Sequence, residues 1–426
     1  MHRLSLASVS VFALLVSSTA SGQPTEKKVP FTGDYTWMNG QSKQKSFPLA
    51  SISPVITPSL YMDVYYAYSF NEPIDHTLTG TASVARHNEL TINLASVGFD
   101  WSYQNAIGRI LLQWGAMTKV IQDLDPTAQR GSGISTDAFR YIREATLGYH
   151  FDELYGVNVE AGIFMSYVGL ESYLLAENWN YNRSILCEFT PFYFTGVRTQ
   201  IFPTDNVKIE PWLMNGYQTY GKWNEAPSAG LATRWQPQEA LAVIANFYTG
   251  TDTRSDTKRV RFHHDHSVLL RAFAEPESDG VSKVAFSINN HAGFEAGGMG
   301  PGPSNAHFLG SAFTSRVWFA RDRAAVTGRF ELLDHPGGYS SQFPPPGFDA
   351  SDGFRVWGVT GNVELMPRDF VSLRLEAMYR SASVPFFSGP GGITSSDGYQ
   401  DSADPSFVPD VKKQQMLVTL GANFRL

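Results

Sequence analysis

The end of the chain alternates strictly between apolar side chains and small or polar ones. This period of two residues is typical of a β-strand with one apolar and one polar face. A strand at a chain end frays unless a neighbouring strand holds it, and the first strand of a closed barrel is such a neighbour. We therefore predict that this strand closes a barrel, and that its outer face contains Val418, Leu420, Phe424 and Leu426.

The same alternation recurs along most of the chain. The clearest further examples are residues 62–70, 157–166 and 371–378. Between residues 89 and 103, the first series of outward apolar residues ends at Leu94 and a second begins at Val97. Because a slip of one residue is what a β-bulge produces, a bulge is predicted near Ala95.

Short and long connections alternate between these segments. Short turns are predicted near residues 104, 153, 204, 237, 277, 322 and 367. Longer segments are predicted at residues 71–88, 119–140, 169–184, 218–226, 251–258, 294–306, 336–352 and 381–412. Bacterial outer-membrane barrels have this asymmetry, with short periplasmic turns and long extracellular loops. The predicted fold is all-β, a transmembrane antiparallel up-and-down β-barrel of about 16 strands, with both chain ends on the periplasmic side.

The N-terminal residues predict export. A basic start at His2 and Arg3 precedes an apolar run at residues 11–16 and small residues at 18–20. This is the pattern of a secretory signal peptide. The predicted organisation is a signal peptide at residues 1–23, a periplasmic N-terminal lead-in at 24–55 and the barrel at 56–426.

Composition is compatible with a barrel and excludes other classes. The mean hydropathy of −0.20 is that of a polar protein, but lumen-facing and lipid-facing residues of barrels cancel each other in such averages. A single cysteine, Cys187, excludes an internal disulfide framework. The net charge of −7 argues against nucleic-acid binding. No Gly-x-Ser-x-Gly nucleophile motif is evident, so neither an enzyme nor a cofactor is predicted.

A large soluble all-β protein is the alternative fold, because its strands would also alternate. Here, however, many long side chains on the polar face are arginines, rather than the mixed lysine, threonine and glutamate of a sheet that faces bulk water. Aromatic residues near strand ends also flank the apolar face, as aromatic girdles do in outer-membrane barrels. They are Trp101, Tyr149, Tyr167, Tyr217, Trp235 and Tyr379.

Three stretches together resemble a known family. They are residues 31–46 with Tyr35-Thr36-Trp37-Met38-Asn39-Gly40, residues 57–70 with Asp63-Val64-Tyr65-Tyr66-Ala67-Tyr68-Ser69-Phe70, and Glu177-Asn178-Trp179-Asn180-Tyr181-Asn182-Arg183-Ser184. With these motifs the sequence resembles the OmpL-like family of β-barrel porins from Gram-negative bacteria, over about residues 31–426. The resemblance implies a passive channel in the cell outer membrane and leaves the solute open.

The third long segment, residues 169–184, is the candidate pore constriction. In general porins the third extracellular loop folds into the lumen, and this segment has that place in the chain order. The residues expected to form the constriction are Glu171, Glu177, Asn178, Asn180, Asn182 and Arg183. The alternative is a loop that lies over the mouth of the barrel.

The alternation also predicts a basic wall on the lumen face. Its members are Arg109, Arg198, Lys208, Arg234, Arg271, Arg316, Arg329 and Arg374. Such a wall opposite loop carboxylates sets up a transverse field, which orients dipolar solutes and filters ions by charge. The alternative is that these residues form ordinary ion pairs that keep the lumen polar.

A His-His-Asp-His sequence at residues 263–266 could indicate a metal site. Adjacent strand residues face opposite sides, so His263 and Asp265 can share a ligand that His264 and His266 cannot reach. This arrangement suits tetrahedral zinc poorly. No metal site is predicted, and we interpret the cluster as a hydrated extracellular rim.

The predicted function is passive diffusion of small hydrophilic solutes through an outer-membrane porin. The alternative is a non-channel barrel with a structural or adhesion role, whose loops fill or cap the lumen. Predicted partners are outer-membrane lipid, the barrel-assembly machinery and small hydrophilic solutes, and a homotrimer stays open beside a monomer. Alternation does not name the solute, because selectivity depends on the geometry of residues 169–184.

Overall fold

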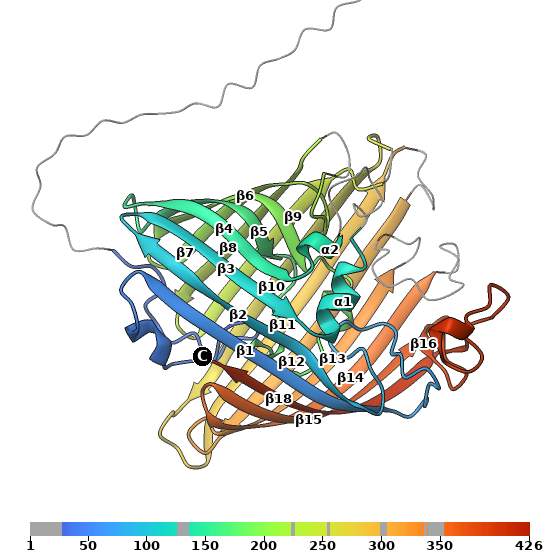
Figure 1. The fold of residues 1–426 in the computed structure, drawn as a ribbon. Helices are drawn as coiled ribbons and strands as arrows, with labels where there is room; N and C mark the ends of the chain where they lie inside the picture. The colour runs from blue at the N-terminus through green and yellow to red at the C-terminus, as the bar shows by residue number, and fades with distance from the viewer. Residues whose placement is uncertain are drawn as a thin grey trace, which may run out of the picture.

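The computed structural model describes residues 28–125, 136–222, 226–253, 256–298, 305–335, 339 and 353–426. Within these residues, sixteen antiparallel strands form one closed barrel (Figure 1). Each strand pairs with the barrel strands that precede and follow it in the sequence, and the last pairs with the first. The predicted fold class is therefore confirmed. The predicted signal peptide, residues 1–23, lies outside the described residues, as does most of the predicted long segment at 336–352.

Strand bounds follow the predicted rhythm of short turns and long loops. The barrel strands are β1 (Ile56–Ser69), β2 (Leu90–Tyr103), β3 (Ala106–Trp114), β4 (Ile142–Phe151), β5 (Val157–Met165), β6 (Tyr193–Thr204), β7 (Val207–Met214), β8 (Ser228–Gln238), β9 (Leu241–Gly250), β10 (Val260–Ala274), β11 (Val281–Ala296), β12 (Asn305–Phe319), β13 (Ala324–His335), β14 (Phe354–Arg368), β15 (Val371–Ala382) and β18 (Gln414–Arg425). The β2–β3 turn has only Gln104 and Asn105, both with positive φ, as in tight hairpins.

The loops carry the remaining elements. They are η1 (Pro48–Ser51), α1 (Ala116–Gln122), α2 (Thr136–Phe139), η3 (Leu175–Glu177), α3 (Ile185–Glu188), η6 (Gln400–Ser402) and a small sheet of β16 (Phe387–Ser388) and β17 (Val411–Lys412). None of the described helices is long and apolar enough to cross a membrane.

The C-terminal strand β18 lies between β1 and β15. Phe424 faces Met62 of β1 across the pair, and the backbones of Leu60 and Leu426 exchange two hydrogen bonds of 2.8 Å. Leu420 is exposed on the outer face. Gly421 on the lumen face packs against the Tyr181 ring, and an added Cβ would lie 2.3 Å from that ring.

The predicted bulge in β2 lies at Asn93, two residues before Ala95. The register against β1 shifts between Asp63 and Val64, which face Leu94 and Ile92. Because Asn93 is the extra residue, both Asn93 and Leu94 are fully buried inside the barrel. The Asn93 amide donates to the Asp63 carboxylate at 2.9 Å, which accounts for a bulge at this position. The prediction that Leu94 faces outward was therefore wrong.

Two of the six predicted girdle aromatics lie inside the barrel. Tyr149 and Trp235 are about half exposed on the outer face. Tyr167 instead lies in the lumen, where its hydroxyl donates to the Phe247 carbonyl, and Tyr217 lies under the Arg261 guanidinium. Both belong to long loops, where the strand alternation used for the prediction no longer applies.

The predicted lead-in partly enters the lumen. Residues 31–46, here called the N-terminal strap, contact the short turns at one end of the barrel. The Phe31 N–H donates to Asp205 in the β6–β7 turn, and Asp369 in the β14–β15 turn accepts the N–H groups of Lys45 and Ser46. The middle of the strap is buried inside the barrel.

Candidate functional site

The connection between β5 and β6, residues 166–192 and here called loop 3, contacts the lumen face of β12–β15. Glu376 of β15 is its main acceptor. This carboxylate accepts the backbone N–H groups of Tyr181 at 2.7 Å and Asn182 at 2.8 Å. It also accepts hydrogen bonds from the side-chain amides of Asn180 and Asn182. A single wall glutamate thus holds three consecutive loop residues.

Arginines from the same wall donate hydrogen bonds to backbone carbonyls of loop 3. Arg316 donates to the Trp179 carbonyl at 2.9 Å, and Arg329 donates to that of Asn182 at 2.8 Å. Arg374 donates to the Leu175 carbonyl at 2.8 Å and to other loop carbonyls. Since an arginine has five donors and no acceptor, carbonyl oxygens in an irregular loop are suitable partners for it.

Two glutamates form ion pairs with these arginines. Glu364 pairs with Arg316 at 2.6 Å, and with Arg374 and Lys43 at 3.1 Å each. Glu331 pairs with Arg380 at 2.7 Å and Arg329 at 3.3 Å. The glutamates and their arginine partners have fully buried side chains, so these pairs interact in a medium of low dielectric constant.

The N-terminal strap meets loop 3 in the middle of the lumen. Asn39 accepts the N–H of Trp179 at 2.8 Å, and the Trp179 indole donates to the Trp37 carbonyl at 2.9 Å. Gly40 has a φ of 75°, and an added Cβ would lie 2.0 Å from the Leu170 carbonyl oxygen. Only glycine fits this close approach.

The outer end of the strap is held by a carboxylate in a turn. Asp369 accepts the N–H groups of Lys45 and Ser46 at 2.6 and 2.7 Å. Burial alone would raise the pKa of Asp369, but these backbone N–H donors and the Ser46 hydroxyl outweigh it, so the pKa lies below its ordinary value.

The six predicted constriction residues come together in loop 3 but differ in role. The three asparagines are fully buried, and their side chains hold the loop to itself or to the wall. Glu177 pairs with Arg425. Glu171 pairs with Arg329 and accepts the Ser184 N–H. Of the six, only Glu171 and Arg183 line the cavity described below.

The eight predicted wall residues fall into two groups. All point into the lumen, in agreement with the alternation. Arg316, Arg329 and Arg374 are fully buried against loop 3. The other five are partly exposed, and the structure places them on β3, β6, β7, β8 and β10: Arg109, Arg198, Lys208, Arg234 and Arg271.

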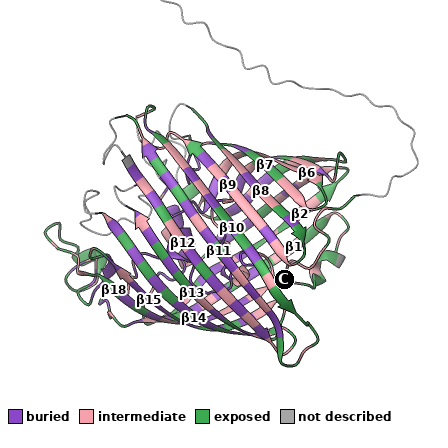
Figure 2. Cartoon of the chain, turned by 180° about the vertical axis from the view of Figure 1, so that it is seen from behind, coloured by how far each residue is buried: buried purple, intermediate pink, exposed green. Residues whose placement is uncertain are grey.

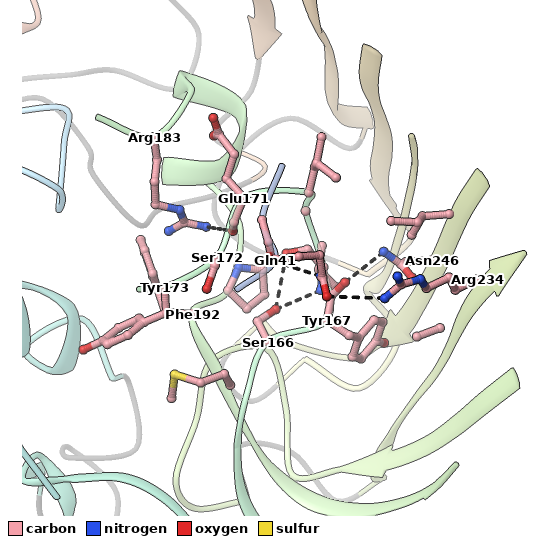
Figure 3. Close-up of a pocket in the computed structure, with 18 of the residues that line it drawn as sticks. Gln41, Ser166, Tyr167, Glu171, Ser172, Tyr173, Arg183, Phe192, Arg234 and Asn246 are labelled. Atoms are coloured by element: carbon pink, nitrogen blue, oxygen red, sulfur yellow. Dashed lines mark hydrogen bonds between the residues drawn. The ribbon is translucent and has the colours of Figure 1, made fainter. Parts of the chain in front are cut away.

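A cavity of about 200 Å³ lies between loop 3, the strap and the lumen face of β7–β9 (Figure 3). Lys208, Arg234 and Asn246 line it from the strands, and Arg183 and Gln41 line it from loop 3 and the strap. Several inward-facing residues of β6–β9 are only half-buried, whereas those of β13–β15 are almost all buried (Figure 2). The described lumen is therefore less tightly filled on the β6–β9 side.

The histidine cluster is not a hydrated rim. His263 is fully buried and contacts the Tyr339 hydroxyl and the His291 ring, each at 2.9 Å. His264 and His266 lie on the opposite face of β10, as the alternation predicts. Among the described residues, no group of three or more His, Cys, Asp and Glu side chains is placed to hold a metal ion.

Sequence reasoning missed the strap and the contacts by which the inward-facing Glu188 joins two loops. Residues 31–46 have no strand or helix period, so no pattern placed them inside the lumen. Glu188 of α3 accepts the Ala82 N–H at 2.9 Å and the Thr81 hydroxyl at 3.0 Å, and so joins the β1–β2 loop to loop 3. The unusual density of Trp, Asn and Tyr in residues 35–40 and 177–184 was the only available signal.

A closed sixteen-stranded barrel with a lumen-facing loop and charged inner walls defines an outer-membrane barrel of the porin type. The family model described as "Putative beta-barrel porin-2, OmpL-like" matches residues 55–426. The chain belongs to this family and to the outer membrane. No curated protein matches the chain.

Solved porin structures share the fold. The anion-selective porin from Comamonas acidovorans is 7% identical, with a TM-score of 0.56 over 87% of this chain and 99% of that one. Pseudomonas putida OprB is 9% identical, with a TM-score of 0.53 over 87% and 94%. Outer-membrane expressed OmpT of Vibrio cholerae is 9% identical, with a TM-score of 0.52 over 87% and 97%. At such identities the likeness establishes the fold alone.

Proposed function

We propose that the protein is a passive diffusion channel for small hydrophilic solutes, with loop 3 and the N-terminal strap as its constriction. The observation that carries the proposal is the uneven filling of the lumen. Loop 3 is bonded to β12–β15, while Lys208 of β7 and Arg234 of β8 line the cavity and stay partly exposed, and Arg198 of β6 is also partly exposed. The solute path runs along the β6–β9 side.

Liposome swelling with neutral sugars, amino acids and peptides of graded size tests this proposal. Because the path is narrow, swelling should be fast for the smallest solutes and should fall steeply with solute size. Purified protein that forms heat-modifiable barrels yet gives neither swelling nor channels in planar bilayers would contradict it.

A non-channel barrel with a structural or adhesion role is the second candidate. The observation that favours it is the filling of the lumen from both ends. The strap enters beside the short turns, and the loops on the other side bring in buried aromatic residues such as Phe386 and Tyr339. Absence of conductance together with specific binding to a surface or cell would support this candidate over the channel.

Assembly is proposed in two respects. OmpT of Vibrio cholerae has a trimer form, and we propose a homotrimer here, to be tested by crosslinking in intact outer membranes.

We also propose that the barrel-assembly machinery recognises β18. Deletion of residues 423–426 should then abolish insertion, because the last ladder bonds to β1 are lost. Heat-modifiable barrels in the membrane fraction would show that closure does not need these residues.

A further inference from the structure

Two arginines that line the cavity have no carboxylate partner among the described residues. Arg183 of loop 3 is 2% exposed, and its guanidinium lies 4.3 Å from the centre of the Phe192 ring. Its Nη2 donates only a long bond of 3.4 Å, to the Glu171 carbonyl, while Nε and Nη1 have no hydrogen-bond partner. The same two nitrogens of the buried Arg143 also have no hydrogen-bond partner, but Arg143 lies 3.9 Å from the Glu144 carboxylate. The missing counter-charge is therefore what distinguishes Arg183.

Arg234 of β8 is the second uncompensated cation. It donates to the amide oxygens of Gln236 at 2.9 Å and Gln41 at 3.3 Å and to the Met38 Sδ at 3.4 Å, and its guanidinium lies over the rings of Phe31 and Tyr35. All of these partners are neutral. They orient the guanidinium but leave its charge unbalanced.

The other charged residues of the cavity are already neutralised. Lys208 pairs with Glu210 at 3.1 Å. Glu171 pairs with Arg329 at 3.0 Å and accepts the Ser184 N–H. The described lining therefore carries two surplus positive charges. Removing a charge from water without a counter-charge is costly, and a bound anion would offset that cost.

We propose that this cavity is a binding site for a small organic dicarboxylate. Arg183 and Arg234 lie at opposite ends of the lining, with Gln41, Ser166 and Tyr167 between them (Figure 3). A guanidinium recognises a carboxylate through a planar pair of donors, and the ligand would displace the long bonds from Arg183 to the Glu171 carbonyl at 3.4 Å and from Arg234 to the Gln41 oxygen at 3.3 Å. The proposal rests on the proposed function only in that the anion reaches the cavity through the lumen.

Size and lining define the ligand further. The volume of about 200 Å³ is below the roughly 300–1,000 Å³ of pockets that hold drug-sized molecules, so the ligand is small. Phe192, Leu170 and Ile244 provide apolar surface for a short carbon chain, while Ser166 and Asn246 provide hydrogen-bonding groups. An inorganic anion would leave the apolar part of the lining without a partner.

The test uses the full-length protein and succinate as the probe. Calorimetric titration of the detergent-solubilised protein measures binding directly, and uptake into liposomes measures transport. Succinate should bind saturably and enter with saturable kinetics. Its uncharged analogue succinamide should do neither, and butyrate, with one carboxylate, should bind more weakly than succinate.

Variants link binding to the two arginines. Arg183→Gln and Arg234→Gln should each weaken succinate binding on the order of 10- to 100-fold, because a hydrogen-bonded charge partner is lost. Arg183→Lys keeps the charge without the planar fork and should lie between the wild type and Arg183→Gln. Arg355→Gln, an exposed outer-face change paired with Asp334, is the matched control and should bind as the wild type does.

The outcomes separate the two proposals. In one outcome, liposomes swell with neutral solutes, but succinate and succinamide enter at equal, non-saturable rates. This result would overturn the dicarboxylate site and leave the channel proposal intact. Calorimetric succinate binding that depends on both arginines, without any conductance, would support the site and overturn the channel. If Arg183→Gln fails to give a heat-modifiable barrel, the test rests on the Arg234→Gln variant, because Arg234 is only half-buried. Unchanged succinate binding in Arg234→Gln would overturn the proposal.

Discussion

The two sides of the lumen use arginine in different ways. On β12–β15, Arg316, Arg329 and Arg374 are fully buried and bind both glutamates and the backbone carbonyls of loop 3. On β6–β8, Arg198 and Arg234 are partly exposed, and Arg234 has no carboxylate partner among the described residues. The same residue type is a structural clamp on one side and a charge presented to the cavity on the other.

The difference follows from what covers each wall. Loop 3 removes water from the β12–β15 side, so the terminal guanidinium nitrogens there bind protein acceptors, and the ion pairs gain strength from the low dielectric constant. Water reaches part of the β6–β9 side, so a guanidinium there without a carboxylate partner keeps part of its hydration. Inward orientation alone therefore does not indicate contact with solute.

The largest effect should come from removing a glutamate that pairs with the buried arginines of β12–β15. Glu364→Ala leaves Lys43, Arg316 and Arg374 without their shared carboxylate, and should destabilise the barrel by about 3–5 kcal/mol. Glu160→Ala on the cavity side breaks one pair with the partly exposed Arg198, and should cost about 1 kcal/mol or less. Urea unfolding in lipid vesicles, followed by tryptophan fluorescence, compares the two.

Equal unfolding midpoints for the two glutamate variants would show that the two walls do not differ energetically. A third variant, Glu376→Ala, refines the result. Its carboxylate holds the N–H groups of Tyr181 and Asn182, so its loss should free loop 3 without leaving a cation unpaired.

The next effect concerns the strap. Deletion of residues 28–46 should raise the single-channel conductance about twofold or more, because conductance rises with the width of the constriction. Gly40→Ala should act in the same direction but less, since its Cβ would displace the strap from the Leu170 carbonyl. Deletion of the exposed residues 400–406 is the control. A wild-type conductance in both strap variants would show that the strap does not narrow the path.

Neutralisation of cavity-side arginines should have a smaller effect. The double variant Arg198→Gln and Arg271→Gln should raise the cation-to-anion permeability ratio about two- to threefold, because each change removes a positive charge from a partly hydrated wall. Reversal potentials in planar bilayers under a salt gradient measure the ratio. Arg355→Gln on the outer face serves as the control, and unchanged potentials in the double variant would contradict the proposed path.

Alternation along the strands predicted the barrel and the inward orientation of arginines on both walls, because the pleat of a strand depends only on the local backbone. It failed where the backbone is irregular. Asn93 shifts the phase of β2, and Tyr217 lies in a loop. Alternation also failed to distinguish the buried arginines of β12–β15 from the cavity-lining ones. Arg316 is buried because it contacts loop 3, where it donates to the Trp179 carbonyl, 137 positions away in the sequence.

The smallest expected effect is a pH dependence of strap docking. The pKa of Asp369 lies below its ordinary value of 3.8 because the docked strap donates N–H groups to its carboxylate. A carboxylate whose pKa is lowered in the docked state favours docking above the ordinary pKa, and this contribution is lost as the pH falls through the lowered value. Conductance should therefore stay constant from neutral pH to about pH 5 and rise by less than about twofold below about pH 4.

The variant Asp369→Asn isolates this group from other carboxylates that titrate in the same range. It cannot ionise, so its strap should be held more weakly at neutral pH, and its conductance should already resemble that of the wild type in acid. The N-terminal end of the strap would keep the hydrogen bond from the Phe31 N–H to the Asp205 carbonyl in the β6–β7 turn. A rise in acid that is equal in the wild type and Asp369→Asn would assign the pH dependence to loop 3 or the cavity instead of the strap.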